Sequence, residues 1–100
     1  MTTAARLDVL PDVPTVADFV PGYEASGFAG IGAPRNTPAE IIATLNKELN
    51  AGLADSKIKG RIVELGGTVT GGSPAEFGKI ISDATEKWAK VIKFAGIKTE

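Results

Sequence analysis

The 100-residue chain contains no histidine and no cysteine, and these absences remove side chains on which much enzyme chemistry depends. Histidine is the commonest metal ligand in proteins and the commonest general acid or base near neutral pH. Cysteine provides disulfides, metal-binding thiolates and thiolate nucleophiles. A hydrolytic triad or a zinc site would therefore need unusual components. We expect a protein that is not an enzyme and that uses no metal and no other cofactor.

The chain also lacks a strong charge of either sign and a long apolar run. Its formal net charge is −1, with 11 basic and 12 acidic side chains. Nucleic acids and anionic membrane surfaces attract strongly basic proteins, so neither is an expected partner. No apolar run is long enough to cross a bilayer, so membrane insertion is not expected. The hydrophobic content of 43% suits one small globular domain.

The first ten residues, MTTAARLDVL, contain one arginine and no apolar segment of the kind that a secretory signal peptide requires. The chain as written therefore shows no export signal. If it is a native open reading frame, this predicts a cytoplasmic protein.

Residues 1–27 are predicted to form an irregular, proline-rich connector. Pro11, Pro14 and Pro21 each lack an N–H group and fix their own φ, so they forbid a regular element longer than about one turn. The same stretch is too apolar for a solvated linker. Its apolar side chains are Leu10, Val13, Val16, Phe19, Val20 and Tyr23. We therefore expect the connector to lie against a larger body.

Residues 28–100 are predicted to form an α/β unit with about three helices and one or two short strands. In SGFAGIGAP, apolar residues alternate with glycine over residues 28–33, which predicts a short buried strand. The β-branched run TVT at residues 68–70 predicts a second, very short strand.

The first helix is expected to start with Thr37 as N-cap, Pro38 as its first residue and Glu40 completing a capping box. Apolar residues then recur at helical spacing up to Leu53. Asp55 or Ser56 is expected to cap a second, shorter helix.

Gly66 and Gly67 are expected to end the second helix, one of them as a left-handed residue. The third helix is expected to start with Ser73 as N-cap, Pro74 and Glu76. Its apolar stripe follows a 3.6-residue period. The stripe consists of Phe77, Ile80, Ile81, Ala84, Trp88, Val91, Ile92 and Ala95. We expect Trp88 to lie in the core.

Three motifs in the chain have features of known binding sites. Gly30-x-Gly32 lacks the third glycine of a dinucleotide fingerprint, so a strand that ends before a helix cap is the better interpretation. The stretch GGTVTGGS lacks the lysine of a phosphate loop, although the N–H groups of residues 71–73 leave a weak anion site open. The lysines of the last helix alternate with acidic residues, which indicates a solvated face.

Four stretches in a fixed order carry a family resemblance. They are LPDVPTVAD, VPGYE, GFAGIGAPRNTPAEIIATLNKELNAGLAD and LGGTVTGGSPAEFGKIISDATEKWAKVIKFAGIK. This order, with the pattern W-x-x-V-x-x-x-x-G-I from Trp88 to Ile97, resembles the C-terminal third of the Bug family. Members of this family are periplasmic solute-binding receptors of tripartite tricarboxylate transporters, also described as TctC-like.

The resemblance implies part of a type II periplasmic-binding-protein lobe. In such receptors two α/β lobes close on a small carboxylated solute, and membrane transporter subunits then accept that solute. The resemblance further implies a strand at residues 28–33 near the hinge, with Phe28 as a ligand-binding residue. The fragment is expected to lack a complete ligand site, and the parent receptor is expected in the periplasm.

A second hypothesis comes from a different class of protein. The chain would be a non-catalytic structural or interaction module that self-associates through its exposed strand and apolar helix faces. An unpaired strand edge is a template for another chain, so a homo-oligomer is a possible state.

Overall fold

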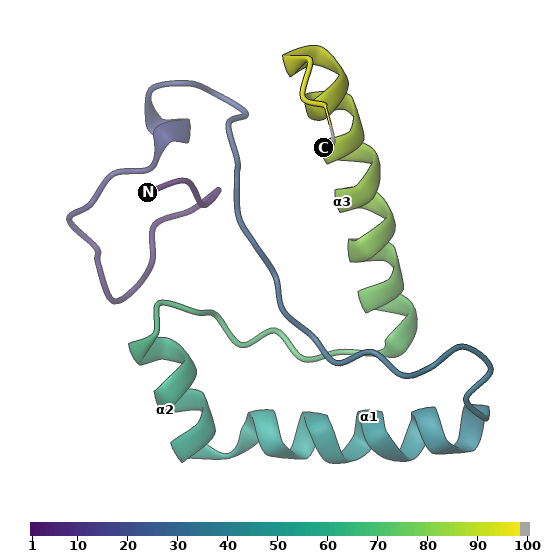
Figure 1. Ribbon diagram of the computed structural model, residues 1–100. Coiled ribbons are helices and arrows are strands. Elements are labelled where there is room, and N and C mark those ends of the chain that lie inside the picture. The colour runs from purple at the N-terminus through teal and green to yellow at the C-terminus, as the bar shows by residue number, and fades with distance from the viewer. Residues whose placement is uncertain (99–100) are drawn as a thin grey trace.

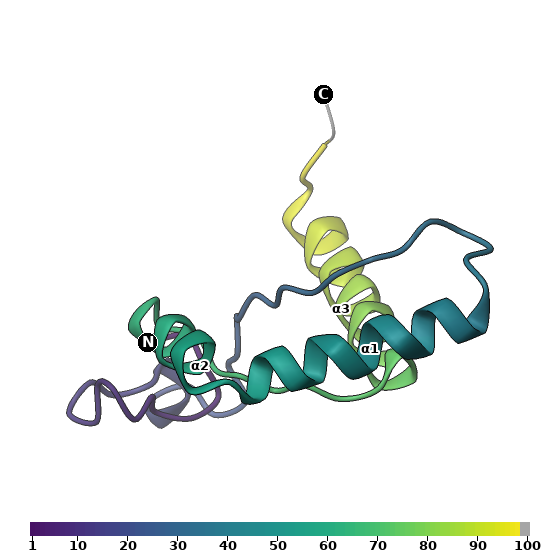
Figure 2. The same ribbon diagram turned by 90° about the horizontal axis from the view of Figure 1, so that it is seen from below.

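The computed structural model describes residues 1–98, and within this range the regular structure is helical (Figure 1). One short 3-10 turn, η1 (Val16–Asp18), precedes α1 (Ala39–Ala54), α2 (Ser56–Glu64) and α3 (Pro74–Ala95). The three expected helices are therefore confirmed. α1 and α2 pack on each other at an angle, whereas α3 rises away from α1 (Figures 1 and 2). Residues 99–100 of the predicted 28–100 unit lie outside the described range.

The caps of α2 form as the sequence predicts. Asp55 Oδ1 accepts hydrogen bonds from the N–H groups of Lys57 at 2.9 Å and Ile58 at 3.1 Å. At the other end Gly66 has φ 80°, and the Gly67 N–H donates to the Ile62 carbonyl at 2.9 Å. This 6→1 bond and the left-handed residue are the marks of a Schellman motif. Local chemistry therefore fixes both ends of α2.

The prediction that Thr37 caps α1 is wrong. The Thr37 hydroxyl donates to the Pro34 carbonyl at 2.7 Å, so it is not available to the helix. α1 begins at Ala39, and Pro38 occupies the N-cap position without a side-chain hydrogen bond. The chain turns tightly just before this point, with Asn36 at φ 68°. The Thr37 hydroxyl forms its hydrogen bond within this turn, so it does not cap the helix.

The two expected strands are also absent from the described chain. Residues 28–33 and 68–70 run extended, but no backbone hydrogen bond joins either segment to a neighbour (Figure 1). A strand is defined by its ladder of inter-strand bonds, and nothing in residues 1–98 supplies one. The sequence pattern therefore gives an extended backbone without a sheet, and the α/β class is not confirmed.

The described residues enclose no apolar core. Thr15, at 2% exposure, is their one buried side chain, and Trp88, which was expected in the core, is 40% exposed. The radius of gyration is 16.6 Å, against about 13 Å for a compact 100-residue domain. Apolar stripes are present on the helices, as expected, but nothing within this range covers them fully.

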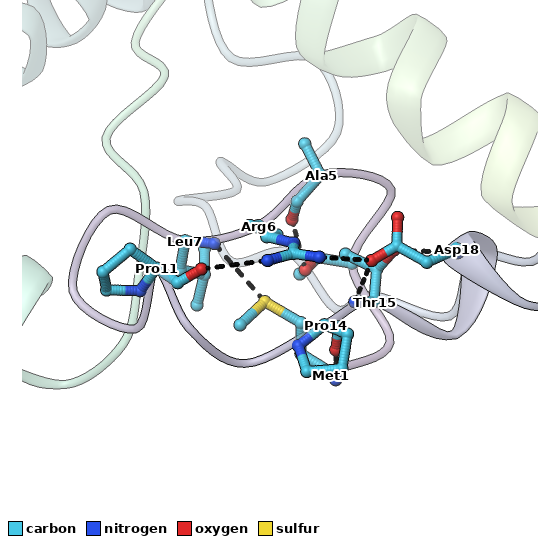
Figure 3. Close-up of polar contacts among 9 residues, drawn as sticks. Met1, Ala5, Arg6, Leu7, Pro11, Pro14, Thr15 and Asp18 are labelled. Carbon is cyan, nitrogen blue, oxygen red and sulfur yellow. Dashed lines mark hydrogen bonds and ion pairs between the residues drawn. The ribbon is translucent and has the colours of Figure 1, made fainter.

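The proline-rich segment closes on itself by hydrogen bonds (Figure 3). The Met1 ammonium donates to the Pro14 carbonyl at 2.7 Å, and the Ala25 N–H donates to the Thr2 carbonyl at 2.9 Å. Thr15 caps η1 by a capping box, in which its hydroxyl accepts from the Asp18 N–H and the Asp18 carboxylate accepts from the Thr15 N–H. These bonds hold an irregular loop without a core beneath it.

An ion pair joins the two limbs of this loop. Arg6 donates to Asp18 Oδ2 at 3.1 Å and to the Pro11 carbonyl at 3.2 Å (Figure 3). The two side chains of this ion pair are about half exposed, so the pair adds little stability by itself.

Within residues 1–98, no helix is long and apolar enough to cross a membrane.

Candidate functional site

A groove of about 540 Å³ separates the extended segment 29–33 from α1 and the start of α3. Residues of the loop 70–74 also line it. Side chains of α1 form one wall and Phe77 and Ile81 of α3 form the other. The principal apolar residues of the groove are Ala29, Ile31, Ala33, Ile42, Leu45, Leu49, Leu53, Ile58, Phe77 and Ile81.

The side chains that line the groove are not of the kind that binds a carboxylate. Glu48 is the one charged residue among those that line it, and no lysine or arginine does so. Its other polar side chains are neutral amides and hydroxyls, among them Asn46, Asn50 and Ser73. An anionic solute would lose its hydration here without gaining a cationic partner. The described residues also contain no cluster of three side chains that could hold a metal ion.

Phe28, the predicted ligand-binding residue, lies beside the groove and contacts one of its walls. Its ring meets Phe77 edge-to-face, with centroids 5.9 Å apart and planes at 86°. This is a favoured aromatic geometry. Phe28 is nevertheless 51% exposed, so Phe77 covers it only in part.

Gly30 allows the extended segment to approach α3 closely. A Cβ atom at this position would lie 2.3 Å from Cζ of Phe77. The glycine therefore makes room for an aromatic ring, which accounts for Gly30 without a dinucleotide. At Gly32, by contrast, no atom lies within 4 Å of the added Cβ.

Two asparagines that sequence reasoning did not single out attach α1 to the loop before α3. Asn50 accepts from the Gly72 N–H at 3.0 Å and donates to the Gly72 carbonyl at 2.9 Å. Asn46 donates to the same carbonyl at 2.8 Å. The only signal in the sequence is two asparagines four residues apart on one helix, which places them on one face.

The weak anion site considered at residues 71–73 is largely occupied by the protein itself. The Gly72 N–H donates to Asn50, and the Ser73 N–H donates to the Glu76 carboxylate at 2.7 Å. The Ser73 hydroxyl accepts from the Glu76 N–H at 3.2 Å, which completes the predicted capping box. A carboxylate therefore stands where an anion would bind.

This capping box should make α3 sensitive to acid. The backbone hydrogen bond from Ser73, assisted by the Ser73 hydroxyl, holds the pKa of Glu76 below its ordinary value of 4.5. A lowered pKa stabilises the folded state above the unfolded value, and this contribution is lost as pH falls through the folded value. We expect the circular dichroism of α3 to weaken below about pH 4.5, and Glu76→Gln to remove that part of the transition.

Glu48→Gln, which alters a carboxylate outside any cap, is the control for this prediction. Asp18 contributes an effect of the same sign, because the Thr15 N–H and Arg6 lower its pKa. An unchanged acid transition in the Glu76→Gln chain would contradict the assignment.

The lysines of α3 form the solvated face that the sequence indicates. Lys79 pairs with Asp83 and Lys90 pairs with Glu86, each at 2.6 Å, with about three quarters of each lysine side chain exposed. Lys87 instead donates to the Glu24 carbonyl at 2.7 Å and so joins α3 to the end of the proline-rich loop.

A family model described as "Tripartite tricarboxylate transporter family receptor" matches residues 1–97. The chain belongs to this family. A UPF0065 protein of Pseudomonas sp. (strain P51), from a tcbD-tcbE intergenic region, is 33% identical over 94 residues. A UPF0065 protein of Agrobacterium vitis, from the TAR-I ttuE-ttuC' intergenic region, is 37% identical over 100 residues. Protein BugT of Bordetella pertussis is 30% identical over 89 residues.

The receptor-family chain spans less than a third of these three relatives. The matches cover 92%, 96% and 88% of this chain, but only 28%, 29% and 27% of the respective relatives. No solved structure matches the chain.

Proposed function

We propose that this chain is the C-terminal part of a periplasmic receptor lobe and contributes to the capture of a small carboxylated solute for a tripartite tricarboxylate-type transporter. Residues 1–27 act as the connector, and residues 28–100 complete a lobe whose remainder lies in another part of the receptor. The chain by itself lacks a complete solute site. The membrane subunits of the transporter are partners of the whole receptor, and no catalytic step is involved.

The observation that carries this proposal is the absence of a buried apolar side chain in residues 1–98. Amphipathic helices bury their apolar faces against other elements. The chain belongs to the receptor family and spans less than a third of its relatives. Both findings support the proposal that the rest of the receptor covers these apolar faces. The extended segments 28–33 and 68–70 would gain their missing strand partners from the same source.

The groove supports the second half of the proposal. It contains no cationic side chain among its lining residues, so it does not offer the chemistry that holds a carboxylate. The solute would instead be held where the two lobes meet, with the exposed part of Phe28 as one wall. Closure of two lobes around a solute is a common switching motion in binding proteins.

Titration of di- and tricarboxylates by calorimetry tests the proposal in two forms of the protein. The isolated chain is expected to bind none of them more tightly than about 1 mM. A chimera that carries this chain in place of the matching part of the Agrobacterium vitis relative is expected to bind at least one, more than tenfold more tightly.

Two further outcomes make this test decisive. Phe28→Ala in the chimera is expected to weaken binding about tenfold, whereas Phe19→Ala, in the connector, is the control. Tight binding by the isolated chain would contradict the incomplete site. A folded chimera that binds no carboxylate would contradict the receptor role.

A further inference from the structure

Lys87 differs from its neighbours on α3 in the group that its side chain contacts. Lys79 and Lys90 pair with carboxylates four residues away on the same helix, whereas the Lys87 ammonium donates to the Glu24 carbonyl, 63 residues away, at 2.7 Å. Asp83, four residues before Lys87, has the spacing of an intrahelical ion pair, but it pairs with Lys79. The Lys87 ammonium therefore attaches another segment of the chain to α3.

The ring of Trp88 supports this ammonium. Lys87 Nζ lies over the ring at 5.6 Å from its centroid, which is within the distance of a cation–π contact. Two groups thus hold the ammonium, the Glu24 carbonyl and an aromatic ring. The second contact favours the lysine conformation that reaches Glu24.

The segment that Lys87 attaches leads directly to Phe28. The other end of this segment is held by the edge-to-face contact of Phe28 with Phe77, at 5.9 Å, and by the close approach of Gly30 to the same ring. Within residues 1–98, no backbone hydrogen bond joins residues 26–30 to another segment. Lys87 and Phe77 therefore attach this stretch to α3 at its two ends.

The distances along the two segments agree with this arrangement. Phe77 and Lys87 are ten residues apart, which corresponds to a rise of about 15 Å in an α-helix. Glu24 and Phe28 are four residues apart, which corresponds to about 13 Å in an extended chain. The segment runs towards α1 while α3 rises away from it (Figure 1). The chain between the two attachment points therefore has little slack, and a shift of Glu24 moves Phe28.

We propose that Lys87 is a positioning residue for the solute site: by holding the Glu24 carbonyl, it keeps Phe28 in place against Phe77. This inference rests on the proposed function, in which Phe28 forms one wall of the site in the whole receptor. Lys87 itself does not touch the solute, because its attachment point lies about 13 Å along the chain from Phe28. An aromatic wall that is already in place loses less freedom on binding than a mobile one. Lys87 therefore raises the affinity through Phe28.

The remaining contacts do not hold Phe28 equally well. A single edge-to-face pair is a weak attachment, and Phe28 is 51% exposed. The Ala25 N–H donates to the Thr2 carbonyl at 2.9 Å, which attaches the segment to the N-terminal loop and not to α3. Without the Lys87 ammonium, the loop and the segment would pivot together on the Phe77 ring.

Nuclear magnetic resonance of the isolated chain tests the positioning without any solute. Lys87→Met keeps an apolar stem and removes the ammonium. We expect the nuclear Overhauser contacts between the Phe28 and Phe77 rings to weaken at least about twofold, because one of two attachments is lost. Lys87→Arg should restore them, since a guanidinium also donates to a carbonyl. Lys90→Met, which loses only the ion pair with Glu86, is the control and should leave them unchanged.

Two results of this experiment would overturn the proposal. Unchanged ring contacts in Lys87→Met would show that Phe77 alone holds Phe28. A loss of helical circular dichroism in Lys87→Met, but not in Lys90→Met, would show that Lys87 acts in folding generally and not in positioning Phe28.

Solute binding by the Agrobacterium vitis chimera tests the consequence for affinity, with the carboxylate that the chimera binds most tightly. Lys87→Met is expected to weaken binding about fivefold. In the Phe28→Ala chimera the same change should weaken it less than about twofold, because the two residues act together. Equal weakening in both backgrounds would show that Lys87 acts without Phe28 and would overturn the proposal. A chimera with both residues native that binds no carboxylate contradicts the receptor role, and the resonance experiment then decides by itself whether Lys87 positions Phe28.

Discussion

Replacing Gly30 with alanine is expected to lower the free energy of unfolding by about 1–3 kcal/mol, because the added methyl group overlaps the ring of Phe77. The ideal Cβ lies 2.3 Å from Cζ and 2.6 Å from Cε1 of that ring, well inside van der Waals contact. The ring cannot turn away without cost, since its edge-to-face contact with Phe28 would be lost. Urea denaturation followed by circular dichroism measures the effect.

Gly32→Ala is the matched control for this prediction. It lies two residues along the same extended segment, and its Cβ would meet no atom within 4 Å. Alanine restricts the unfolded chain, so this change should be neutral or stabilise by up to about 1 kcal/mol. The two substitutions thus have opposite expected signs.

A double-mutant cycle identifies the cause of the Gly30 effect. In a Phe77→Ala chain, Gly30→Ala should cost little, because the ring that it clashes with is gone. An equal cost in both backgrounds would show that the clash with Phe77 is not responsible.

The helix ends show what sequence can and cannot predict. TPAE and SPAE carry the same capping signal, yet Ser73 caps α3 and Thr37 does not cap α1. Ser73 follows Gly71 and Gly72, both with positive φ, and its hydroxyl is free to accept from Glu76. The Thr37 hydroxyl donates to Pro34 instead. A capping motif predicts the helix reliably, but a preceding turn decides which residue closes it.

Features that depend on distant parts of the chain were not predictable in the same way. The apolar residues at 28–33 favour an extended backbone, but a strand also needs a partner that residues 1–98 do not provide. Periodicity likewise identified the stripe of α3 and placed Trp88 on it, without showing what covers it. The Thr15–Asp18 capping box is present in the sequence as T-x-x-D, and the three-residue η1 that it caps fits the limit of about one turn that the prolines set.

The groove depends on a contact of this non-local kind, between Asn50 and Gly72, which are 22 residues apart. Asn50 uses both ends of its amide, accepting from the Gly72 N–H and donating to the Gly72 carbonyl. Only an amide side chain can satisfy both groups in this geometry. Asn50 thereby holds the loop 70–74 against α1. This contact fixes the position of the start of α3 relative to α1.

We therefore expect Asn50→Ala to destabilise the chain by about 1–3 kcal/mol, through loss of two to three hydrogen bonds at about 1 kcal/mol each. Asn50→Asp should cost a similar amount, since a carboxylate accepts from the Gly72 N–H but repels the Gly72 carbonyl. Asn46→Ala should cost less, because Asn46 makes one bond to the loop and Asn50 shares its acceptor.

Hydrogen exchange of the Gly72 amide reports on this contact more directly than global unfolding does. The Gly72 N–H donates to Asn50 in the folded chain, so its exchange should accelerate about tenfold or more in Asn50→Ala. In Asn46→Ala the same amide should remain protected, because its acceptor is unchanged. Equal acceleration in both variants would mean that the loop is held by the general packing of α1, and that Asn50 does not determine the position of α3.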